Sequence, residues 1–236
     1  MNVPFFFAEH NSPAGDETLL DEETSRHIVQ VLRKQQGERI RLTDGRGHLI
    51  EGEITHAHKN KCTVRTLTST YISRPLPSLT IAVSLIKNSG RFEWFSEKAT
   101  ELGTAEIIPM ICDRTEKQHM RSERLVSICK SAMLQSEQLW MPVVREPLPF
   151  KTVTNQATQH QKLFGHISPQ KTENLASAID HSLGSHIILI GPEGDFSKEE
   201  IDIAKAQGFE GVSFGNTILR VETAAIYAAV VHTARR

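Results

Sequence analysis

The N-terminal third of the chain consists of short runs in which apolar and polar positions alternate, a pattern typical of strands with one buried face. A turn sequence, Asp44–Gly47, separates two of these runs and predicts a hairpin. A helix is predicted over about residues 22–32, where Ile28, Val31 and Leu32 share a face. The predicted strands are Pro4–Ala8, Arg39–Thr43, His48–His56 and Cys62–Thr70. Together these elements predict a small, β-rich, barrel-like domain.

A change of pattern follows the segment 73–78. Pro75 and Pro77 favour extended backbone there and mark a linker between a domain of residues 1–72 and a second one of residues 79–236. Strand-like and helix-like runs alternate in the second part, which predicts an α/β domain with a mostly parallel sheet. The predicted strands are Leu79–Ile86, Glu106–Met110, Val143–Arg145, Lys162–His166, His186–Ile190 and Gly211–Phe214. The predicted helices include Phe92 to Leu102, Leu125 to Leu139, Glu173–Ser182, Lys198–Gln207 and Val221–Arg235.

Composition narrows the class of protein. The 236 residues are 39% hydrophobic and 23% charged, which excludes a disordered or fibrous chain. No apolar run approaches the ~20 residues of a membrane span, and the N-terminus lacks the features of a signal peptide. Three distant cysteines and histidines without ligand spacing predict neither disulfides nor a metal site. We therefore expect a cytoplasmic protein that binds no metal and no membrane.

The charge balance bears on nucleic-acid binding. Lys and Arg number 27 against 28 Asp and Glu, so the net charge is −1 and the chain as a whole has no electrostatic attraction to RNA or DNA. Any RNA contact must therefore use a local basic face. The stretch from Arg114 to Lys130 is the richest in cations, and it fits either a solvated helix face or an RNA-backbone contact.

The segment Ile187–Ser197 carries the first candidate site. A fully apolar strand runs into Gly-Pro-Glu-Gly, and Ser197 with Glu200 has the spacing of a capping box at the start of a helix. Glycines let backbone approach a ligand closely, and loops after parallel strands are where open α/β sheets bind ligands. The segment lacks the signatures of a dinucleotide or P-loop site, so an ordinary strand-to-helix turn remains an alternative.

A second candidate site spans Phe214–Ala225. Gly215 and Asn216 turn the chain after a strand, and Arg220 with Glu222 opens an alanine-rich helix. Glu222 in the first turn suits the helix dipole, whereas Arg220 does not and requires an anionic partner. The small residues let another element pack closely, although a helix buried within the chain explains them equally well.

These motifs together resemble the RsmE family of SPOUT (knotted) methyltransferases. The resemblance rests on Gly191–Gly194 followed by a capped helix, and on the Ile-Leu-Arg-x-Glu-Thr-Ala sequence at 218–224. Further matches are residues 98–103 with 107–109, and Gln135-Ser136 with Pro142. Near the N-terminus, residues 27–33, Gly37 and 44–45 resemble the family's PUA-like RNA-binding domain. The matches cover the whole chain in the expected order.

The resemblance implies a fold, a cofactor and a reaction. The fold would be an α/β domain tied in a deep trefoil knot, with a small PUA-like β-barrel domain before it. S-adenosylmethionine would bind in the knot of a homodimer, and the enzyme would methylate N3 of a uridine, position 1498, in 16S ribosomal RNA of the small (30S) subunit. The residues implied to hold the cofactor are Phe164, His166, Leu189, Ile190, Gly191, Pro192, Glu193, Gly194, Phe214, Gly215, Asn216, Ile218, Leu219, Thr223 and Ala224.

Residue roles in catalysis and RNA binding follow from this reaction. The uracil N3–H must lose its proton before N3 attacks the methyl group, so a cation that stabilises the developing anion accelerates the step. Arg220 is the candidate for that role, with phosphate binding or loop orientation as alternatives, and Glu222 is a candidate proton acceptor. We expect the RNA backbone to contact Arg33, Arg41, Arg46, Arg114 and Arg121.

The chain departs from the family pattern at three positions. Asp195 stands where the family has a second glycine, Gln138 replaces an arginine, and Pro4 replaces an arginine before the N-terminal phenylalanines. Other classes of function also remain: an RNA-binding module without catalysis, an enzyme that modifies another ribosomal or transfer RNA base, or a nucleotide- or sugar-binding α/β enzyme. The last predicts a phosphate-binding signature that this sequence lacks.

Overall fold

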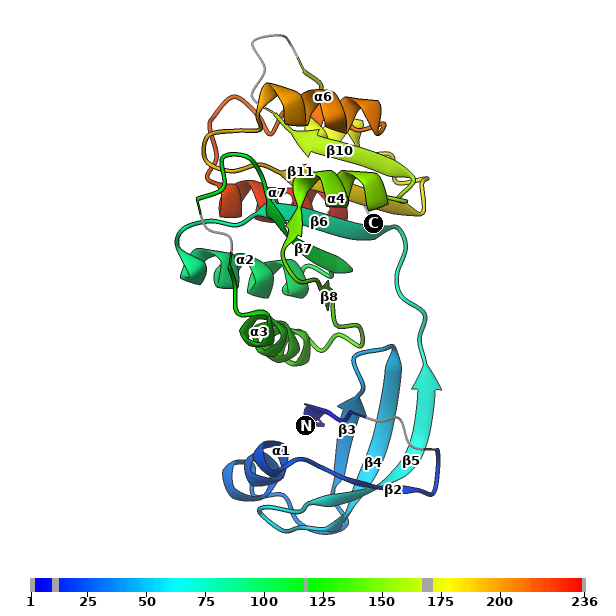
Figure 1. The fold of residues 1–236 in the computed structure, drawn as a ribbon. Coiled ribbons are helices and arrows are strands. Elements are labelled where there is room, and N and C mark those ends of the chain that lie inside the picture. Colours follow the sequence, from blue (N-terminus) through cyan, green and yellow to red (C-terminus); the bar gives the residue numbers. More distant parts are fainter. Residues whose placement is uncertain (1–2, 10–12, 117–118, 167–171, 235–236) are drawn as a thin grey trace. The chain divides into compact units, whose positions relative to one another are not determined.

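The structure is a computed structural model, and it describes residues 3–9, 13–116, 119–166 and 172–234 (Figure 1). The chain forms two compact units. The first contains residues 1–74 and 133–141, and the second contains residues 75–132 and 142–236. The division after Arg74 falls within the segment that the prolines mark as a linker. The inclusion of 133–141 in the first unit has no signal in the local sequence pattern.

The small unit contains a five-stranded sheet with the order β1-β3-β4-β5-β2. Strands β1 and β3 pair in parallel, and the other pairs are antiparallel. The strands are β1 (Phe5–Phe7), β2 (Glu17–Leu19), β3 (Arg39–Thr43), β4 (His48–His56) and β5 (Thr63–Tyr71). Strands β3 and β4 have the predicted bounds. Strand β2 was not predicted, because its three residues are exposed or half-buried and leave no alternating pattern.

The predicted helix of the small unit changes its geometry halfway. Helix α1 (Glu22–Arg26) starts at Asp21, whose carboxylate accepts a hydrogen bond from the Thr24 amide at 2.7 Å, and it continues as the π-helical turn η1 (His27–Val31). The wider π turn shifts the side-chain directions. Ile28 is therefore fully buried, whereas Val31 is 66% and Leu32 40% exposed, and the expectation that these three residues share one face is wrong.

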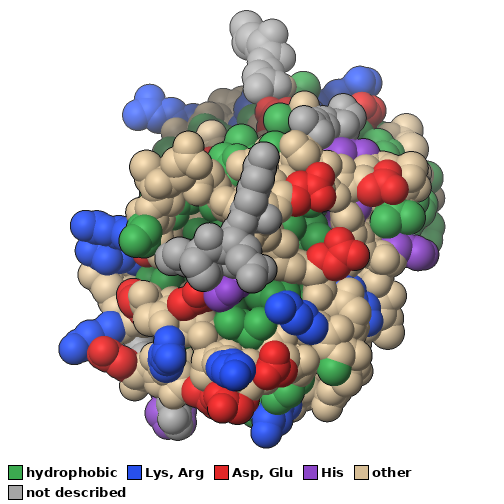
Figure 2. All heavy atoms as spheres, turned by 90° about the horizontal axis from the view of Figure 1, so that it is seen from above, with side chains coloured by type: hydrophobic (Ala, Val, Ile, Leu, Met, Phe, Trp, Pro, Cys, Tyr) green, Lys and Arg blue, Asp and Glu red, His purple; other side chains and the backbone are tan. Residues whose placement is uncertain are grey.

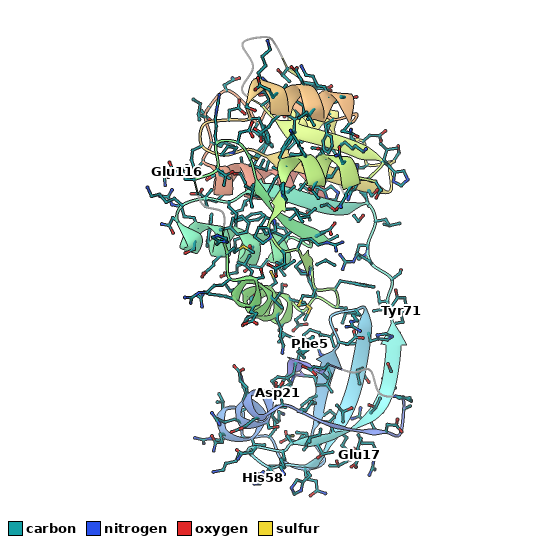
Figure 3. The ribbon with its side chains drawn as sticks, in the orientation of Figure 1. Phe5, Glu17, Asp21, His58, Tyr71 and Glu116 are labelled. Atoms are coloured by element: carbon teal, nitrogen blue, oxygen red, sulfur yellow. The ribbon has the colours of Figure 1, made fainter. Side chains whose placement is uncertain are left out.

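Residues 133–141 pack on the small unit through Trp140. Its indole N–H donates to the carbonyl oxygen of Ile72 at 2.9 Å, and the Arg74 guanidinium lies 4.7 Å from the centre of its ring. Tyr71, at the end of β5 (Figure 3), contacts the same ring edge-on at 6.0 Å. A Cβ atom on Gly47, which has a φ of +99°, would lie 2.6 Å from the indole, so this position requires glycine.

The second unit has a parallel sheet with the order β12-β10-β11-β6-β7-β8, and β9 also pairs with β7. The strands are β6 (Ser78–Ser84), β7 (Glu106–Ile111), β8 (Val143–Val144), β9 (Leu148–Pro149), β10 (Gln161–Gly165), β11 (Ser185–Ile190) and β12 (Glu210–Val212). The central strands β6 and β11 are buried over almost their whole length, as strands covered on both faces should be.

Helices cover both faces of this sheet (Figure 1). Residues of α4 and α6 share a core cluster with Ala82, Ile108 and Leu189, whereas α2 packs against α7, which in turn packs against β6. The helices are α2 (Ser89–Glu101), α3 (Ser122–Gln135), α4 (Phe150–Gln156), α5 (Leu175–Ala178), α6 (Lys198–Ala206) and α7 (Val221–Thr233).

The expectations for three helices need correction. The helix expected from Leu125 to Leu139 ends at Gln135, just before Glu137, which has a φ of +53°. The helix expected over 173–182 is the single turn α5, because Ile179 is extended and the Asp180 carboxylate accepts the amide of Ser182 at 2.9 Å, forming a local turn. Helix α4 was not predicted, since its seven residues are too few to show a helical period. Within the described residues, no helix has the length and apolar character needed to cross a bilayer.

Candidate cofactor and RNA site

The candidate site lies at the carboxyl edge of the parallel sheet. Strands β10, β11 and β12 run in the same direction, with Phe164 paired to Leu189 and to Gly211. The segments that follow these strands therefore leave the sheet at one edge, as the sequence predicts for the two candidate loops. We call residues 191–197 the β11 loop and residues 213–220 the β12 loop.

The β11 loop is held by side chains from two other segments. The His166 imidazole, just after β10, lies 3.0 Å from the Asp195 carboxylate, and the Arg114 guanidinium donates to the carbonyl oxygen of Gly194. Asp195 has a φ of +61°, the left-handed region that favours glycine. The family's glycine at this position therefore matches a real backbone requirement, and Asp195 supplies in its place a carboxylate that fastens the loop to His166.

The end of the β11 loop is fixed by a buried carboxylate. Ser197 and Glu200 form the predicted capping box, with the Ser197 amide 2.9 Å from Glu200 Oε2. Glu200 is 3% exposed, and its other oxygen accepts the amide of Asp113 at 2.9 Å. The Asp113 carboxylate in turn accepts the Ser197 hydroxyl at 2.6 Å. This network joins the end of β7 to the start of α6, and the sequence indicated its capping box but not Asp113.

The β12 loop is much less constrained. Its first part is a turn in which the Gly215 amide donates to the Ser213 hydroxyl at 3.1 Å. The amides of 216–220 donate no hydrogen bond to any residue that the structure describes. Ile218 is 82% exposed, although isoleucine side chains are usually buried. The loop therefore exposes an apolar side chain and several backbone amides that have no acceptor among the described residues.

The β12 loop packs closely on the end of β10 at a glycine. A Cβ atom on Gly165 would lie 2.0 Å from the ring of Phe214, so that ring occupies the space above the glycine. Phe214 also meets Tyr227 of α7 edge-on at 5.8 Å. By contrast, a Cβ on Gly215 would meet nothing within 4 Å, and its φ of +114° suits glycine.

The candidate catalytic residues lie at the start of α7 in different surroundings. Arg220 is the residue that precedes the helix and is exposed, and its guanidinium makes no ion pair or hydrogen bond with the part of the chain described here. Glu222 is 7% exposed, and its carboxylate lies 3.6 Å from Nε of Arg91 in α2. Arg220 is thus available to an anion, whereas Glu222 links the first turns of two helices.

The alanine face of α7 packs within the chain. Ala225, Ala228 and Ala229 are fully buried, and α7 contacts α2, β6 and β11. The explanation of these small residues by a helix buried in its own chain is therefore sufficient. The outer side of the helix carries Thr223 and Val230, both exposed.

The residues proposed to hold the cofactor divide by burial. The buried ones serve the core through their side chains and offer a ligand only backbone; they are Phe164, Leu189, Ile190, Pro192 and Ala224. The half-buried ones border the sheet edge: His166, Gly191, Phe214 and Leu219. The exposed ones lie on the loops or at the start of α7: Glu193, Gly194, Gly215, Asn216, Ile218 and Thr223.

The arginines expected to contact RNA have different roles in the structure. Arg33, Arg46 and Arg121 are exposed. Arg41 is held by Glu137 at 3.0 Å and by the carbonyl oxygen of Val3, and Arg114 supports the β11 loop. Figure 2 shows basic and acidic side chains interspersed on the face it displays, in agreement with a net charge of −1.

The three cysteines are free and buried. Burial raises the pKa of the thiols of Cys62, Cys112 and Cys129, which therefore stay protonated and unreactive near neutral pH. In the described ranges, no three His, Cys, Asp or Glu side chains are grouped so as to hold a metal ion.

Comparison with known proteins identifies the class. Residues 73–233 match the RNA methyltransferase domain family, and residues 20–67 match the RNA methyltransferase PUA domain family. The chain therefore belongs to the RNA methyltransferase family.

Several proteins similar to this chain are named ribosomal RNA small subunit methyltransferase E. The Synechocystis protein is 32% identical over 84% of this chain, and the match spans 66% of that protein. The Rickettsia conorii protein is 30% identical over 86% of this chain and 83% of its own length. A Neisseria gonorrhoeae structure of the same name, bound to S-adenosyl methionine, is 27% identical with a TM-score of 0.87 and covers 99% of this chain and 98% of its own.

These similarities confirm the predicted fold class. The large unit is an α/β RNA methyltransferase domain with a mostly parallel sheet, and the small unit is an RNA methyltransferase PUA domain. The trefoil knot stays a prediction from the family resemblance, because topology rules do not lead to a knotted fold.

Proposed function

We propose that this protein transfers a methyl group from S-adenosylmethionine to N3 of one uridine in 16S ribosomal RNA. Family membership, the names of the relatives and the S-adenosyl methionine in the Neisseria gonorrhoeae structure support this function. The observation that carries it is the sheet edge itself. There, the β11 loop is held by His166 and Arg114, and the amides of the β12 loop donate to none of the described residues; the Arg220 guanidinium, which has no ion pair among those residues, follows directly.

The residues present suit S-adenosylmethionine. Gly194 and Gly215 leave backbone exposed at the sheet edge, and Gly215 has open space where a side chain would lie. The free amides of 216–220 are donors for the polar groups of an adenosine or a methionine. Ile218 and Leu219 supply apolar surface for an adenine ring. A ligand here would accept hydrogen bonds from backbone amides that have no acceptor among the described residues.

The reaction requires alignment and removal of one proton. Bound S-adenosylmethionine supplies a methyl group on a positively charged sulfur. The uracil N3 loses its proton, bonds to the methyl carbon as the carbon–sulfur bond breaks, and S-adenosylhomocysteine is released with the proton. In this proposal Arg220 stabilises the negative charge that develops on the uracil. Glu222 stays a candidate proton acceptor, although its contact with Arg91 also gives it a positioning role.

The proposal extends to the assembly. We infer a cytoplasmic homodimer that acts on 16S RNA within the 30S subunit. Because the alanine face of α7 is used within the chain, a dimer contact through this helix would have to use its exposed side, which includes Val230. Light scattering at micromolar concentration tests this assembly, and a monomer mass would refute it.

Transfer of labelled methyl groups tests the reaction. The substrates are 30S subunits from cells that lack the endogenous activity, with free 16S RNA and transfer RNA as matched controls. We expect one N3-methyluridine in 16S RNA, at position 1498. Label in transfer RNA or on another base would instead support a different RNA modification, and no transfer to any substrate would refute the proposed activity.

A further inference from the structure

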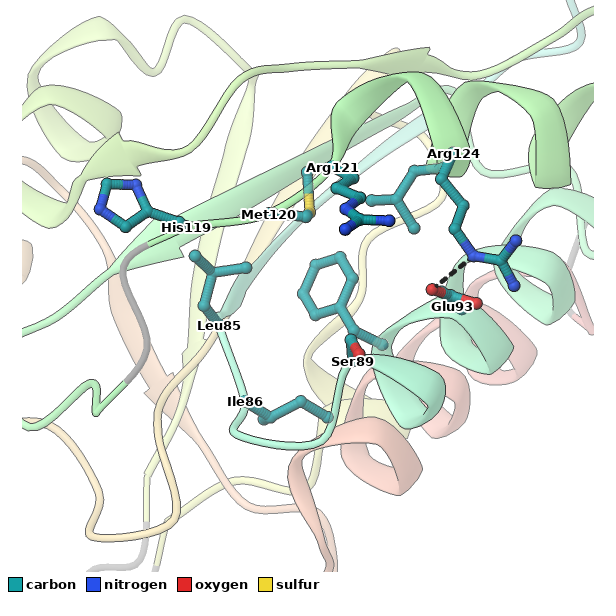
Figure 4. Close-up of a pocket in the computed structure, with 10 residues that line it drawn as sticks. Leu85, Ile86, Ser89, Glu93, His119, Met120, Arg121 and Arg124 are labelled. Atoms are coloured by element: carbon teal, nitrogen blue, oxygen red, sulfur yellow. Dashed lines mark hydrogen bonds and ion pairs between the residues drawn. The ribbon is translucent and has the colours of Figure 1, made fainter.

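A cavity of about 450 Å³ lies in the second unit between the start of α2 and the start of α3. The volume falls within the range of about 300–1,000 Å³ typical of small-molecule sites. Apolar side chains line it together with polar and basic groups (Figure 4). The lining includes Leu85, Ile86, Phe92 and Leu125, with Ser89, Glu93, His119, Met120, Arg121 and Arg124.

The cavity lies at the same sheet edge as the candidate cofactor loops. Val83 of β6 pairs with Ile190 of β11, so Leu85 and Ile86 leave the sheet beside the point where Gly191 begins the β11 loop. The first turn of α2 is also joined to that of α7, through Arg91 and Glu222. A ligand in this cavity would therefore lie next to the segments proposed to hold the methyl donor.

The chemistry of the lining suits a nucleotide. The apolar side chains offer surface to the faces of a base, and the polar groups offer both donors and an acceptor. The Arg124 guanidinium donates to the Glu93 carboxylate at 2.8 Å, and the Arg121 guanidinium points into the cavity (Figure 4). Uracil presents two carbonyl acceptors and one imide donor, so it needs this mixture of groups, and Arg121 suits its phosphate.

We propose that this cavity receives the uridine that is methylated, extruded from the RNA. This inference rests on the proposed function, because a base-modifying enzyme must remove its target from the surrounding stack to reach the reacting atom. The uracil ring lies against the apolar lining, with its edge toward Ser89 and Glu93 and its phosphate toward Arg121. This assignment gives Arg121 a specific nucleotide contact in place of a general contact with the RNA backbone.

Binding of uridine 5′-monophosphate tests the cavity independently of catalysis. The titration uses the full chain saturated with S-adenosylhomocysteine, so that the cofactor site is filled. Ser89 is exposed at the start of α2, and Ser89→Tyr places a ring in the cavity. We expect this change to weaken uridine monophosphate binding about tenfold or more, while Ser131→Tyr on an exposed position of α3 leaves it unchanged. Unchanged affinity in Ser89→Tyr, or equal binding of adenosine monophosphate or inorganic phosphate by the parent protein, overturns the assignment.

Kinetics provide the second readout. Arg121→Gln should raise the KM for 30S subunits about five- to tenfold with little change in S-adenosylhomocysteine affinity, because one charge-assisted contact is lost. Lys151→Gln, an exposed cation on α4, is the matched control. An unchanged KM in Arg121→Gln contradicts the phosphate contact. If the parent protein methylates no RNA, the proposed function fails; if it does and Ser89→Tyr binds uridine monophosphate normally, the cavity assignment alone fails.

Discussion

The β11 and β12 loops leave the same sheet edge, but the chain treats them differently. In the β11 loop, the amides of Asp195, Phe196 and Ser197 all have acceptors within the protein, and His166 and Arg114 hold the loop from outside. In the β12 loop, the amides of 216–220 have none among the described residues, and Ile218 is exposed.

The difference indicates that the two loops have different roles in ligand binding. The β11 loop is already ordered by contacts within the chain, so we expect its backbone to lose little conformational entropy when a ligand binds. The β12 loop has amides without acceptors among the described residues, which we expect a ligand to satisfy, and Arg220 follows this loop directly. We infer that cofactor binding completes the β12 loop and so positions the cation for the chemical step. The predictions below test this contrast.

The largest effect is expected at Arg220. Arg220→Ala should lower kcat by about 10²–10³ through lost stabilisation of transition-state charge, while RNA affinity stays nearly intact. The melting temperature should change little, because the guanidinium makes no hydrogen bond or ion pair with the described residues. Turnover and RNA binding are measured on 30S subunits, with Lys151→Gln as the control. Equal losses of turnover and RNA affinity would make Arg220 a binding residue.

The next effect concerns the fixed loop. Gly194→Val adds a branched side chain where a Cβ would lie 3.3 Å from the Arg114 side chain. We expect S-adenosylmethionine affinity to fall about tenfold or more, because the rigid loop cannot move aside. Calorimetry on Gly194→Val and on Gly184→Val, a glycine just before β11 where a Cβ would lie an ordinary 3.7 Å from His160, separates this effect from the general effect of adding a valine. Unchanged affinity in Gly194→Val would remove Gly194 from the cofactor site.

A smaller effect is expected for the cap of α6. Ser197→Ala removes the hydroxyl that caps the helix and donates to Asp113, at a cost of about 0.5–2 kcal/mol in free energy of unfolding. Thermal unfolding should show a decrease of roughly 2–4 °C for each kcal/mol in a chain of this size. Ser213→Ala, in the β12 loop, should change the melting temperature less. A larger loss from Ser213→Ala would reverse the contrast between the loops.

The smallest effect is expected at Asp195. Asp195→Gly relieves the left-handed strain but loses the contact with His166, so we expect a net change in free energy of unfolding below about 1 kcal/mol. Asp195→Ala keeps the strain and loses the contact, so it should be less stable than Asp195→Gly by about 1 kcal/mol. Denaturant titration of both variants checks the order. If Asp195→Ala is the more stable, backbone conformation does not govern this position.

Much of this architecture is readable from local patterns. Strands β3 and β4 and the capping box of Ser197 and Glu200 have strong period and spacing signals, and the structure has them as predicted. The contacts that distinguish the two loops join distant segments: Asp113 with Ser197, His166 with Asp195, and Arg91 with Glu222. No pattern along the chain encodes such pairs, because they arise only when strands become neighbours. The same holds for 133–141, whose place in the small unit depends on Trp140 meeting Gly47.

Amide hydrogen exchange, with and without S-adenosylhomocysteine, tests the contrast between the loops most directly. Before ligand is added, the amides of 195–197 should exchange slowly and those of 216–220 rapidly, because only the former are hydrogen-bonded within the described chain. Saturating ligand should protect 216–220 and leave 195–197 little changed. Rapid exchange at 195–197 in the free protein, or no added protection at 216–220 on binding, would contradict the account.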